Sequence, residues 1–215
     1  MNNLDEIFSE SQSARNYAQR YASYLSELLR SLDIQAIEET IAIFREARSK
    51  GNTIFFVGNG GSAATSSHFA EDLEYGTRTE GKQSFRVLSL TDNTPYITAV
   101  ANDEGYENVF VRQLQSHFSP GDVLVGISAS GNSPNIIKAV EYANDNGGIT
   151  IGMTGFDGGR LKNLSRCCIH VKTVKGAYGP VEDVHLVLGH IISTYLMYML
   201  RQEPPNTSGE TSKGE

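Results

Sequence analysis

A loop of serine and glycine at residues 128–133 carries the groups with the clearest chemical use in this chain. It follows the apolar run 123–127, which is typical of a buried parallel strand, and precedes residues 136–143, where apolar positions recur at helical spacing. Ser133 suits the cap of that helix and Pro134 its first turn, so free backbone N–H groups face the loop. Hydroxyls, amides and the positive helix end together predict a phosphate site built without lysine. Its expected members are Ser128, Ala129, Ser130, Gly131 and Ser133.

A second loop, residues 58–62, follows the predicted strand 53–57 and runs into another helix. Its glycines let backbone amides approach a ligand closely, which makes it a second candidate anion loop. Neither usual nucleotide fingerprint is present, because the dinucleotide glycine spacing and the Gly-Lys pair of a P-loop are both absent. Each loop alone could be an ordinary turn whose side chains only close local hydrogen bonds. The two together predict a phosphorylated metabolite that lies across neighbouring strand ends.

The elements that must position these loops alternate between strand and helix from residue 52 onward. The predicted strands are 53–57, 86–90, 122–127, 149–154 and 167–172, and the predicted helices are 61–75, 94–102, 106–117, 133–146 and 180–200. Such alternation predicts an α/β fold with a doubly wound, mostly parallel five-stranded sheet flanked by helices. Ligands of such a sheet bind at the carboxyl ends of its strands, where both loops are.

An N-terminal helical extension precedes this domain. Residues 4–47 have a helical pattern with a break at 31–33, where Asp33 is expected to cap a second helix. Two helices this amphipathic must pack on the main domain or on another subunit, and a subunit interface is favoured. The predicted division is therefore 1–50 for oligomerisation, 51–202 for the α/β domain and 203–215 for a disordered tail.

Composition excludes several classes of protein. The 215 residues suit one α/β domain with an extension, and the net charge of −7 without a run of lysine and arginine argues against nucleic acid or an anionic membrane as partner. Cys167 and Cys168 are adjacent in an apolar run and are expected to be small strand hydrophobes. No leader-like apolar region or membrane-span pattern was recognised, so a cytoplasmic location is predicted.

Six segments of the chain resemble one known domain. They are GNGGS at 58–62, HFAEDL at 68–73, AND at 101–103, GDVL at 121–124, SASGNS at 128–133 and TGFDGG at 154–159. Together they resemble the sugar-isomerase (SIS) domain and, more narrowly, the phosphoheptose isomerases, which interconvert sedoheptulose 7-phosphate and D-glycero-D-manno-heptose 7-phosphate. The resemblance covers residues from about 5 to 200 and includes the helical N-terminus, which other SIS proteins usually lack.

This resemblance implies a homotetramer, or a dimer, with sites at subunit interfaces and a divalent metal, expected to be zinc. In the family the ion is held by two histidines, a glutamate and a glutamine, and by position that set falls on His68, Asp72, Glu182 and His190. His68 and Asp72 are four residues apart on one predicted helix, so both side chains face the same way. Aspartate replaces the family's glutamate at 72 and glutamate replaces its glutamine at 182, which keeps an oxygen ligand at each place.

The resemblance also implies an aldose–ketose isomerisation of a phosphorylated sugar. That reaction moves a proton between adjacent carbons through an enediol and needs a base, a partner acid and a group that polarises the carbonyl. Asp72 is the expected base, His190 the partner, and the divalent metal the polariser. The expected substrate contacts are Asn59, Gly60, Gly61, Ser62, Asn102, Asp103 and Glu182, in addition to the serine loop. His185 and Glu71 are alternative candidates for the metal or acid–base role, and His117 and His170 are expected to be structural.

Two alternatives stay open. The family has an Asp-Arg pair where this chain has Gly179-Pro180, and an arginine where it has Gly76, which favours an isomerase of another phosphosugar. A close relative of the family is a non-catalytic protein that bridges copies of the bacterial replication initiator. That relative lacks the acid and histidine set, whereas this chain keeps versions of it, which favours an enzyme.

Overall fold

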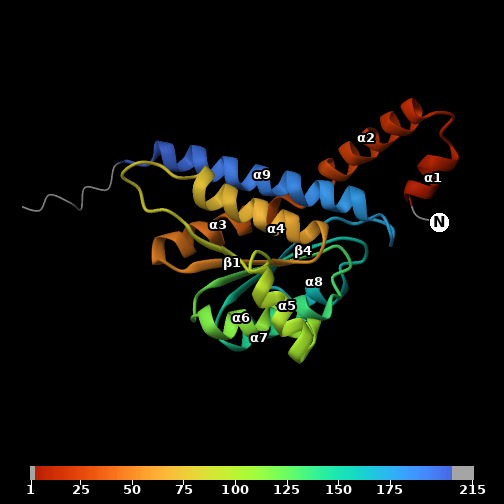
Figure 1. The fold of residues 1–215 in the computed structure, drawn as a ribbon. Helices are drawn as coiled ribbons and strands as arrows, with labels where there is room; N and C mark the ends of the chain where they lie inside the picture. Colours follow the sequence, from red (N-terminus) through yellow and green to blue (C-terminus); the bar gives the residue numbers. More distant parts are fainter. Residues whose placement is uncertain (1–2, 205–215) are drawn as a thin grey trace, which may run out of the picture.

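Five parallel strands form the sheet of residues 3–204, the part of the chain that this computed structural model describes (Figure 1). Their order is β2-β1-β3-β4-β5, and each neighbouring pair is parallel. The strands are β1 (Thr53–Gly58), β2 (Arg86–Ser89), β3 (Val123–Ser128), β4 (Ile149–Thr154) and β5 (Cys167–His170). The predicted doubly wound α/β sheet is confirmed, and it is wholly parallel.

The two candidate anion loops leave the sheet at its switch point. β1 lies between β2 and β3, so the chain moves from β1 outward to β2 and then returns to the other side of β1. Gly58 at the end of β1 pairs with Ile127 near the end of β3, and the loops that follow therefore start at the same edge. Open α/β sheets bind their ligands in the crevice at such a point.

Helices cover both faces of the sheet (Figure 1). α3, α4 and α9 pack on one face, and α5 to α8 lie on the other. Phe55 and Phe56 of β1 show the division, because they are neighbours in sequence and belong to the two opposite core clusters. A strand buried on both faces has a continuous apolar run, and the apolar run at 53–57 predicts β1 for this reason. The helices are α1 (Asn3–Ser9), α2 (Ala14–Arg30), α3 (Ile34–Lys50), α4 (Gly61–Glu71), α5 (Thr94–Glu104), α6 (Val111–His117), α7 (Pro134–Asp145), α8 (Gly159–Leu164) and α9 (Tyr178–Gln202).

The N-terminal helices project from this body (Figure 1). Leu28 is the single buried residue of α2, whereas α3 packs on the sheet through several buried side chains. The predicted cap is confirmed, since Asp33 accepts hydrogen bonds from two backbone N–H groups at the start of α3. The single helix expected before residue 31 is in fact two, because Ser13 caps α2 by accepting a backbone hydrogen bond.

Three other elements differ from the sequence prediction. α4 ends in one π-helical turn, η1 (Asp72–Gly76), and the helix expected at 106–117 is a short 3-10 turn, η2 (Tyr106–Asn108), followed by α6. α8 was not predicted, because it is only one and a half turns long and starts among glycines. Most of the predicted disordered tail, residues 205–215, lies outside the described residues.

α9 is the long apolar helix of the described chain. By length and composition alone it could cross a membrane. It packs along α4 and the sheet instead, and Val184, Leu188 and Ile192 are fully buried there. Its apolar composition is that of a core helix in this fold.

Candidate active site

Three serine hydroxyls meet at the end of β3. Ser128 Oγ lies 3.5 Å from Ser130 Oγ and 3.1 Å from Ser133 Oγ. Ser133 is the N-cap residue of α7, as predicted, but its side chain makes no capping hydrogen bond. The hydroxyl is turned toward the other serines instead. An anion bound at this point would therefore meet several O–H donors.

Two of these hydroxyls also accept hydrogen bonds from the loop backbone. The N–H of Gly131 donates to Ser128 Oγ at 3.2 Å, and the N–H of Asn132 donates to Ser130 Oγ at 3.3 Å. Such bonds belong to an ordinary turn, which was the alternative reading of the sequence. A hydroxyl that accepts from the backbone keeps its own O–H to donate. The turn is thus compatible with a phosphate site, and it orients the donors.

Gly131 allows the serine loop to lie against the loop after β4. Its φ is 62°, and a Cβ atom at this position would stand 2.0 Å from the carbonyl oxygen of Gly158. The N–H of Leu161 donates to the carbonyl of Gly131 at 2.9 Å. A side chain at 131 would force the two loops apart, so both conformation and packing require glycine here.

A cavity of about 130 Å³ opens between the serine loop, the loop after β1 and the start of α9. Its lining residues are Asn59, Ser62, Ile127, Ser128, Ala129, Ser130, Ser133, Tyr178 and Glu182. Most of them were predicted from the sequence, and Gly60 and Gly61 form the turn into α4 beside them. Tyr178 was missed, because no motif marks it and the helix was expected to begin at residue 180. Its ring packs edge-on against Phe156 at 5.0 Å between centroids.

Glu182 lies against the start of α4. A Cβ atom on Gly61, the first residue of that helix, would stand 2.3 Å from Glu182 Oε2, so the contact requires glycine. The carboxylate is placed at the positive end of the helix, which favours its charge. Partial burial, and secondly the neighbouring carboxylate of Asp183, nevertheless raise the pKa of Glu182 above its usual value. A phosphate in the cavity would have this acid as a neighbour.

Asn102 and Asp103 are not brought to this cavity. Both are exposed near the end of α5, where Asn102 Nδ2 donates to Asp103 Oδ1 at 2.7 Å. Neither residue is among those that line the cavity. Their predicted contact with sugar hydroxyls stays a prediction.

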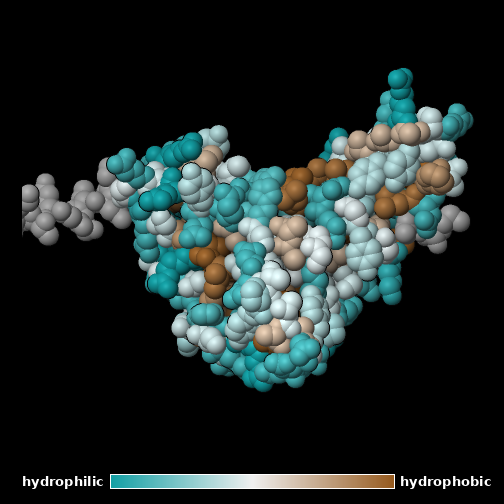
Figure 2. Space-filling model, in the orientation of Figure 1, coloured by the Kyte–Doolittle hydropathy of each residue, from teal (hydrophilic) through white to brown (hydrophobic). Residues whose placement is uncertain are grey.

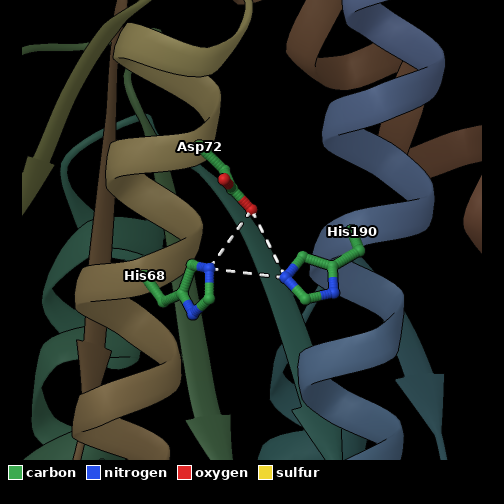
Figure 3. A group of neighbouring side chains, drawn as sticks. All are labelled: His68, Asp72 and His190. Atoms are coloured by element: carbon green, nitrogen blue, oxygen red, sulfur yellow. Dashed lines mark hydrogen bonds and ion pairs between the residues drawn. The ribbon is translucent and has the colours of Figure 1, made fainter.

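His68, Asp72 and His190 form a separate group between α4 and α9 (Figure 3). The two Nε2 atoms are 3.3 Å apart, and Asp72 Oδ2 lies 3.7 Å from each of them. The imidazole side chains are nearly half exposed, at 46% and 49%, and the carboxylate is less so, at 26%. The i, i+4 spacing where α4 continues into η1 brings His68 and Asp72 together, as predicted, and α9 supplies His190.

The three atoms are spaced like ligands of one zinc ion. With bonds of about 2.0–2.2 Å in a tetrahedral site, ligand atoms lie roughly 3.4 Å apart, close to the distances observed here. Glu182, the fourth predicted ligand, is not in this group. It precedes His190 by eight residues on α9, which is about 12 Å along the helix. A three-residue set would leave a fourth position for water or substrate, as catalytic zinc sites do.

The other histidines take no part in this group. His185 is fully buried, its Nε2 lies 3.3 Å from the carbonyl oxygen of Thr154, and burial lowers its pKa to about 4. His170 Nδ1 lies 3.0 Å from Thr154 Oγ1, and burial lowers its pKa as well. His117 ends α6, on the opposite face of the sheet from α4 and α9.

Known proteins match most of this chain. The model of the SIS domain matches residues 16–155. A phosphoheptose isomerase of Akkermansia muciniphila is 42% identical over 156 residues, which are 73% of this chain and 81% of that protein. Another, of Aneurinibacillus thermoaerophilus, is 39% identical over 188 residues, or 87% and 90%. This chain belongs to the phosphoheptose isomerase branch of the SIS domain family.

A solved structure extends the agreement to the whole SIS fold. The structure of a phosphoheptose isomerase from Francisella tularensis superposes with a TM-score of 0.76 at 26% identity, and the match covers 92% of this chain and 100% of that one. The structural match covers a larger share of this chain than residues 16–155, which the SIS model matches. The resemblance stated from the sequence is confirmed.

The serine loop of this SIS protein gives a first prediction. Changing Ser130→Ala and Ser133→Ala together removes two O–H donors, each worth about 1.5–3 kcal/mol as a charge-assisted bond to phosphate. We expect the affinity for a phosphosugar to fall by tens-fold or more in isothermal titration. Ser165→Ala, whose hydroxyl donates to the carbonyl of Leu161, is the control. An unchanged affinity in the double variant would refute the site.

Glu182 gives a second prediction. Its carboxylate repels a phosphate dianion in the cavity, so Glu182→Gln should bind inorganic phosphate more tightly at pH 8, by about 3- to 10-fold for a partly exposed pair of charges. Because the pKa of Glu182 is raised, its carboxylate takes up a proton at a higher pH than an ordinary glutamate does. As pH falls, the difference in phosphate affinity between the variant and the native protein should therefore shrink. Glu38→Gln, on α3, removes the same charge away from the cavity lining and should change nothing. Weaker phosphate binding in Glu182→Gln would contradict the repulsion.

Proposed function

We propose that this chain isomerises sedoheptulose 7-phosphate to D-glycero-D-manno-heptose 7-phosphate. The observation that carries the proposal is the pairing of two different groups along α4 and α9. One is the cavity lined by Ser128, Ser130 and Ser133 at the start of α4, here called the serine cavity. The other is the group of His68, Asp72 and His190. The activity named for the relatives supports the choice of sugar.

The separation of the two groups suits the two ends of this substrate. His68 follows Gly61 by seven positions on α4, which is about 10 Å along the helix axis. The phosphate and the carbonyl of a heptulose 7-phosphate are at opposite ends of a seven-carbon chain. With the phosphate in the serine cavity, an extended chain along α4 would bring its carbonyl end toward Asp72.

The residues of the group can perform the proton transfer. The reaction takes a proton from the carbon next to the carbonyl and returns it to the former carbonyl carbon through an enediol. Asp72 directs Oδ2 at both imidazoles, which leaves Oδ1 as the oxygen that can take the proton. His190 is the proposed partner in the proton transfer, and because its Nε2 faces the other two ligand atoms, Nδ1 is the nitrogen that would carry the proton when a metal is bound. A divalent ion, zinc by its ligand set, would be held by His68, Asp72 and His190 and would supply a Lewis acid for the carbonyl oxygen.

The same observation favours an enzyme over a binding protein. A phosphosugar-binding or initiator-bridging SIS protein would need the serine cavity but no base or metal ligands. Here the acid and both histidines are within 4.8 Å of one another through their ligand atoms. An isomerase of a different phosphosugar is the second candidate, because Gly179 and Gly76 leave out the charged groups that the family has there. The cytoplasm stays the predicted location.

We infer further that copies of this chain associate, as a tetramer or a dimer, over the half-exposed group of His68, Asp72 and His190, here called the metal group. Ile191, Tyr195 and Tyr198 are large exposed side chains of α9, and Tyr75 is exposed on η1, three residues after Asp72. Figure 2 shows apolar surface where α2 leaves the body beside α9. A second copy on this face would cover the apolar side chains and exclude water from the histidines.

Turnover tests the function directly. We expect conversion of sedoheptulose 7-phosphate to exceed that of other ketose phosphates in a small panel, with loss of activity in chelator and recovery with zinc or manganese. Faster conversion of another ketose phosphate would support the second candidate. Full activity in metal-free protein would contradict the metal role.

Single histidine variants test the metal group. His68→Ala and His190→Ala should each abolish turnover and lower zinc affinity in equilibrium dialysis, because each removes one of three ligands. Circular dichroism should show an intact fold, since both side chains are nearly half exposed. His117→Ala, the control, should keep both activity and zinc. Zinc affinity that survives either ligand variant would place the ion elsewhere.

Truncation tests the association. Removing residues 1–30 deletes α1 and α2, which bury little on the body, so the core sheet should remain folded. The truncated protein should form smaller or aggregating species in light scattering, because exposed apolar surface loses its cover. A full-length protein that scatters as a 23.5 kDa monomer would refute the association.

A further inference from the structure

Asn59 is held by hydrogen bonds from two other elements. Its Nδ2 donates to Asn135 Oδ1 at 2.9 Å, and its Oδ1 accepts from Asn135 Nδ2 at 2.8 Å. The hydroxyl of Tyr106 donates to the same Oδ1 at 2.9 Å. Asn135 stands in the first turn of α7 and is only 2% exposed. The pair therefore joins the loop after β1 to the helix that follows the serine loop.

A backbone group fixes which way round the two carboxamides stand. The N–H of Ile136 donates to Asn135 Oδ1 at 3.0 Å, and a backbone N–H can only donate. The oxygen of Asn135 must therefore be the atom beside Ile136. Its Nδ2 then faces Asn59, which has to present its own oxygen to that donor. The backbone N–H of Ile136 therefore sets the orientation of the Asn59 carboxamide through Asn135.

The remaining capacity of Asn59 is one donor. A carboxamide has two acceptor lone pairs and two N–H donors. Asn135 and Tyr106 occupy both lone pairs of Oδ1, and Asn135 occupies one N–H. No described residue forms a hydrogen bond with the second N–H, and Asn59 lines the serine cavity. A ligand group that meets this side chain must therefore be an acceptor.

We propose that Asn135 is a positioning residue that locks Asn59 as a pure hydrogen-bond donor toward a sugar oxygen, with Tyr106 as a second brace. The acceptor is a hydroxyl or ester oxygen of the phosphosugar, next to the phosphate in the serine cavity. The identity of this ligand rests on the proposed function, whereas the locked carboxamide does not. Without Asn135, the hydroxyl of Tyr106 could pair with either end of the amide, and Asn59 would turn freely.

A double-mutant cycle tests this role. Asn135→Ala should raise the Kd and KM of sedoheptulose 7-phosphate by about 5- to 10-fold, the value of one neutral hydrogen bond, and leave kcat within about 2-fold. In an Asn59→Ala background the same change should add less than about 2-fold, because its effect passes through Asn59. Tyr106→Phe should cost only about 2-fold, since the reciprocal pair persists. Asn144→Ala, an exposed asparagine near the other end of α7, is the matched control.

Inorganic phosphate separates positioning from a structural role. Its Kd should stay within about 2-fold in Asn135→Ala, because the three serines are untouched. Equal loss of inorganic phosphate and sugar phosphate binding, or additive effects of Asn59→Ala and Asn135→Ala, would overturn the proposal.

A spectroscopic measurement keeps the test independent of turnover. The side-chain amide signals of Asn59, assigned by their loss in Asn59→Ala, should be well separated and slow to exchange with water in the native protein. They should become averaged and fast to exchange in Asn135→Ala. If the native protein neither binds nor converts the heptulose phosphate, the proposed function fails. The amide signals still test whether Asn135 fixes the orientation of Asn59. Unchanged signals in Asn135→Ala would refute it.

Discussion

The contact between α4 and α9 is the constraint on which both chemical groups depend. The aromatic ring of Phe69 packs between Phe44 and Phe56 in the core. α9 approaches this ring at Gly189, where an added Cβ atom would stand 3.4 Å from it. At the start of α4, Gly61 admits the carboxylate of Glu182 in the same way. This apolar packing places His190 beside His68 on the outer side of the two helices.

Electrostatics in the cavity depend on neutral donors. Among the residues that line it there is no lysine or arginine, and the chain as a whole has a net charge of −7. Serine hydroxyls and the N-terminal amides of α4 and α7 must therefore supply the attraction for a phosphate. Glu182 opposes it from the α9 side. The balance favours a ligand that also makes contacts beyond its phosphate, as a long phosphosugar would.

The N-terminal extension is connected to this site by a hydrogen bond. The hydroxyl of Tyr21 on α2 donates to Asp183 Oδ2 at 2.5 Å, next to Glu182. Burial and the Asp183 carboxylate raise the pKa of Tyr21, so the phenol stays a donor throughout the physiological range. Asp183 in turn contributes to the raised pKa of Glu182. The helix that projects from the body thus helps to hold the charged end of α9.

The sequence by itself determined the parallel sheet, the places of the two serine- and glycine-rich loops and the pairing of His68 with Asp72, because each is marked by a local pattern of strand, turn or i, i+4 spacing, whereas His190 was placed only by the resemblance to the family. Tertiary structure alone decided where α9 meets α4. As a result, Glu182 lines the serine cavity and lies outside the group of His68, Asp72 and His190. It also decided that Tyr178, Tyr106 and Asn135 lie beside the serine loop or the loop after β1. These contacts join segments tens of residues apart, and the relative register of packed helices is set by the whole core, which no local periodicity encodes.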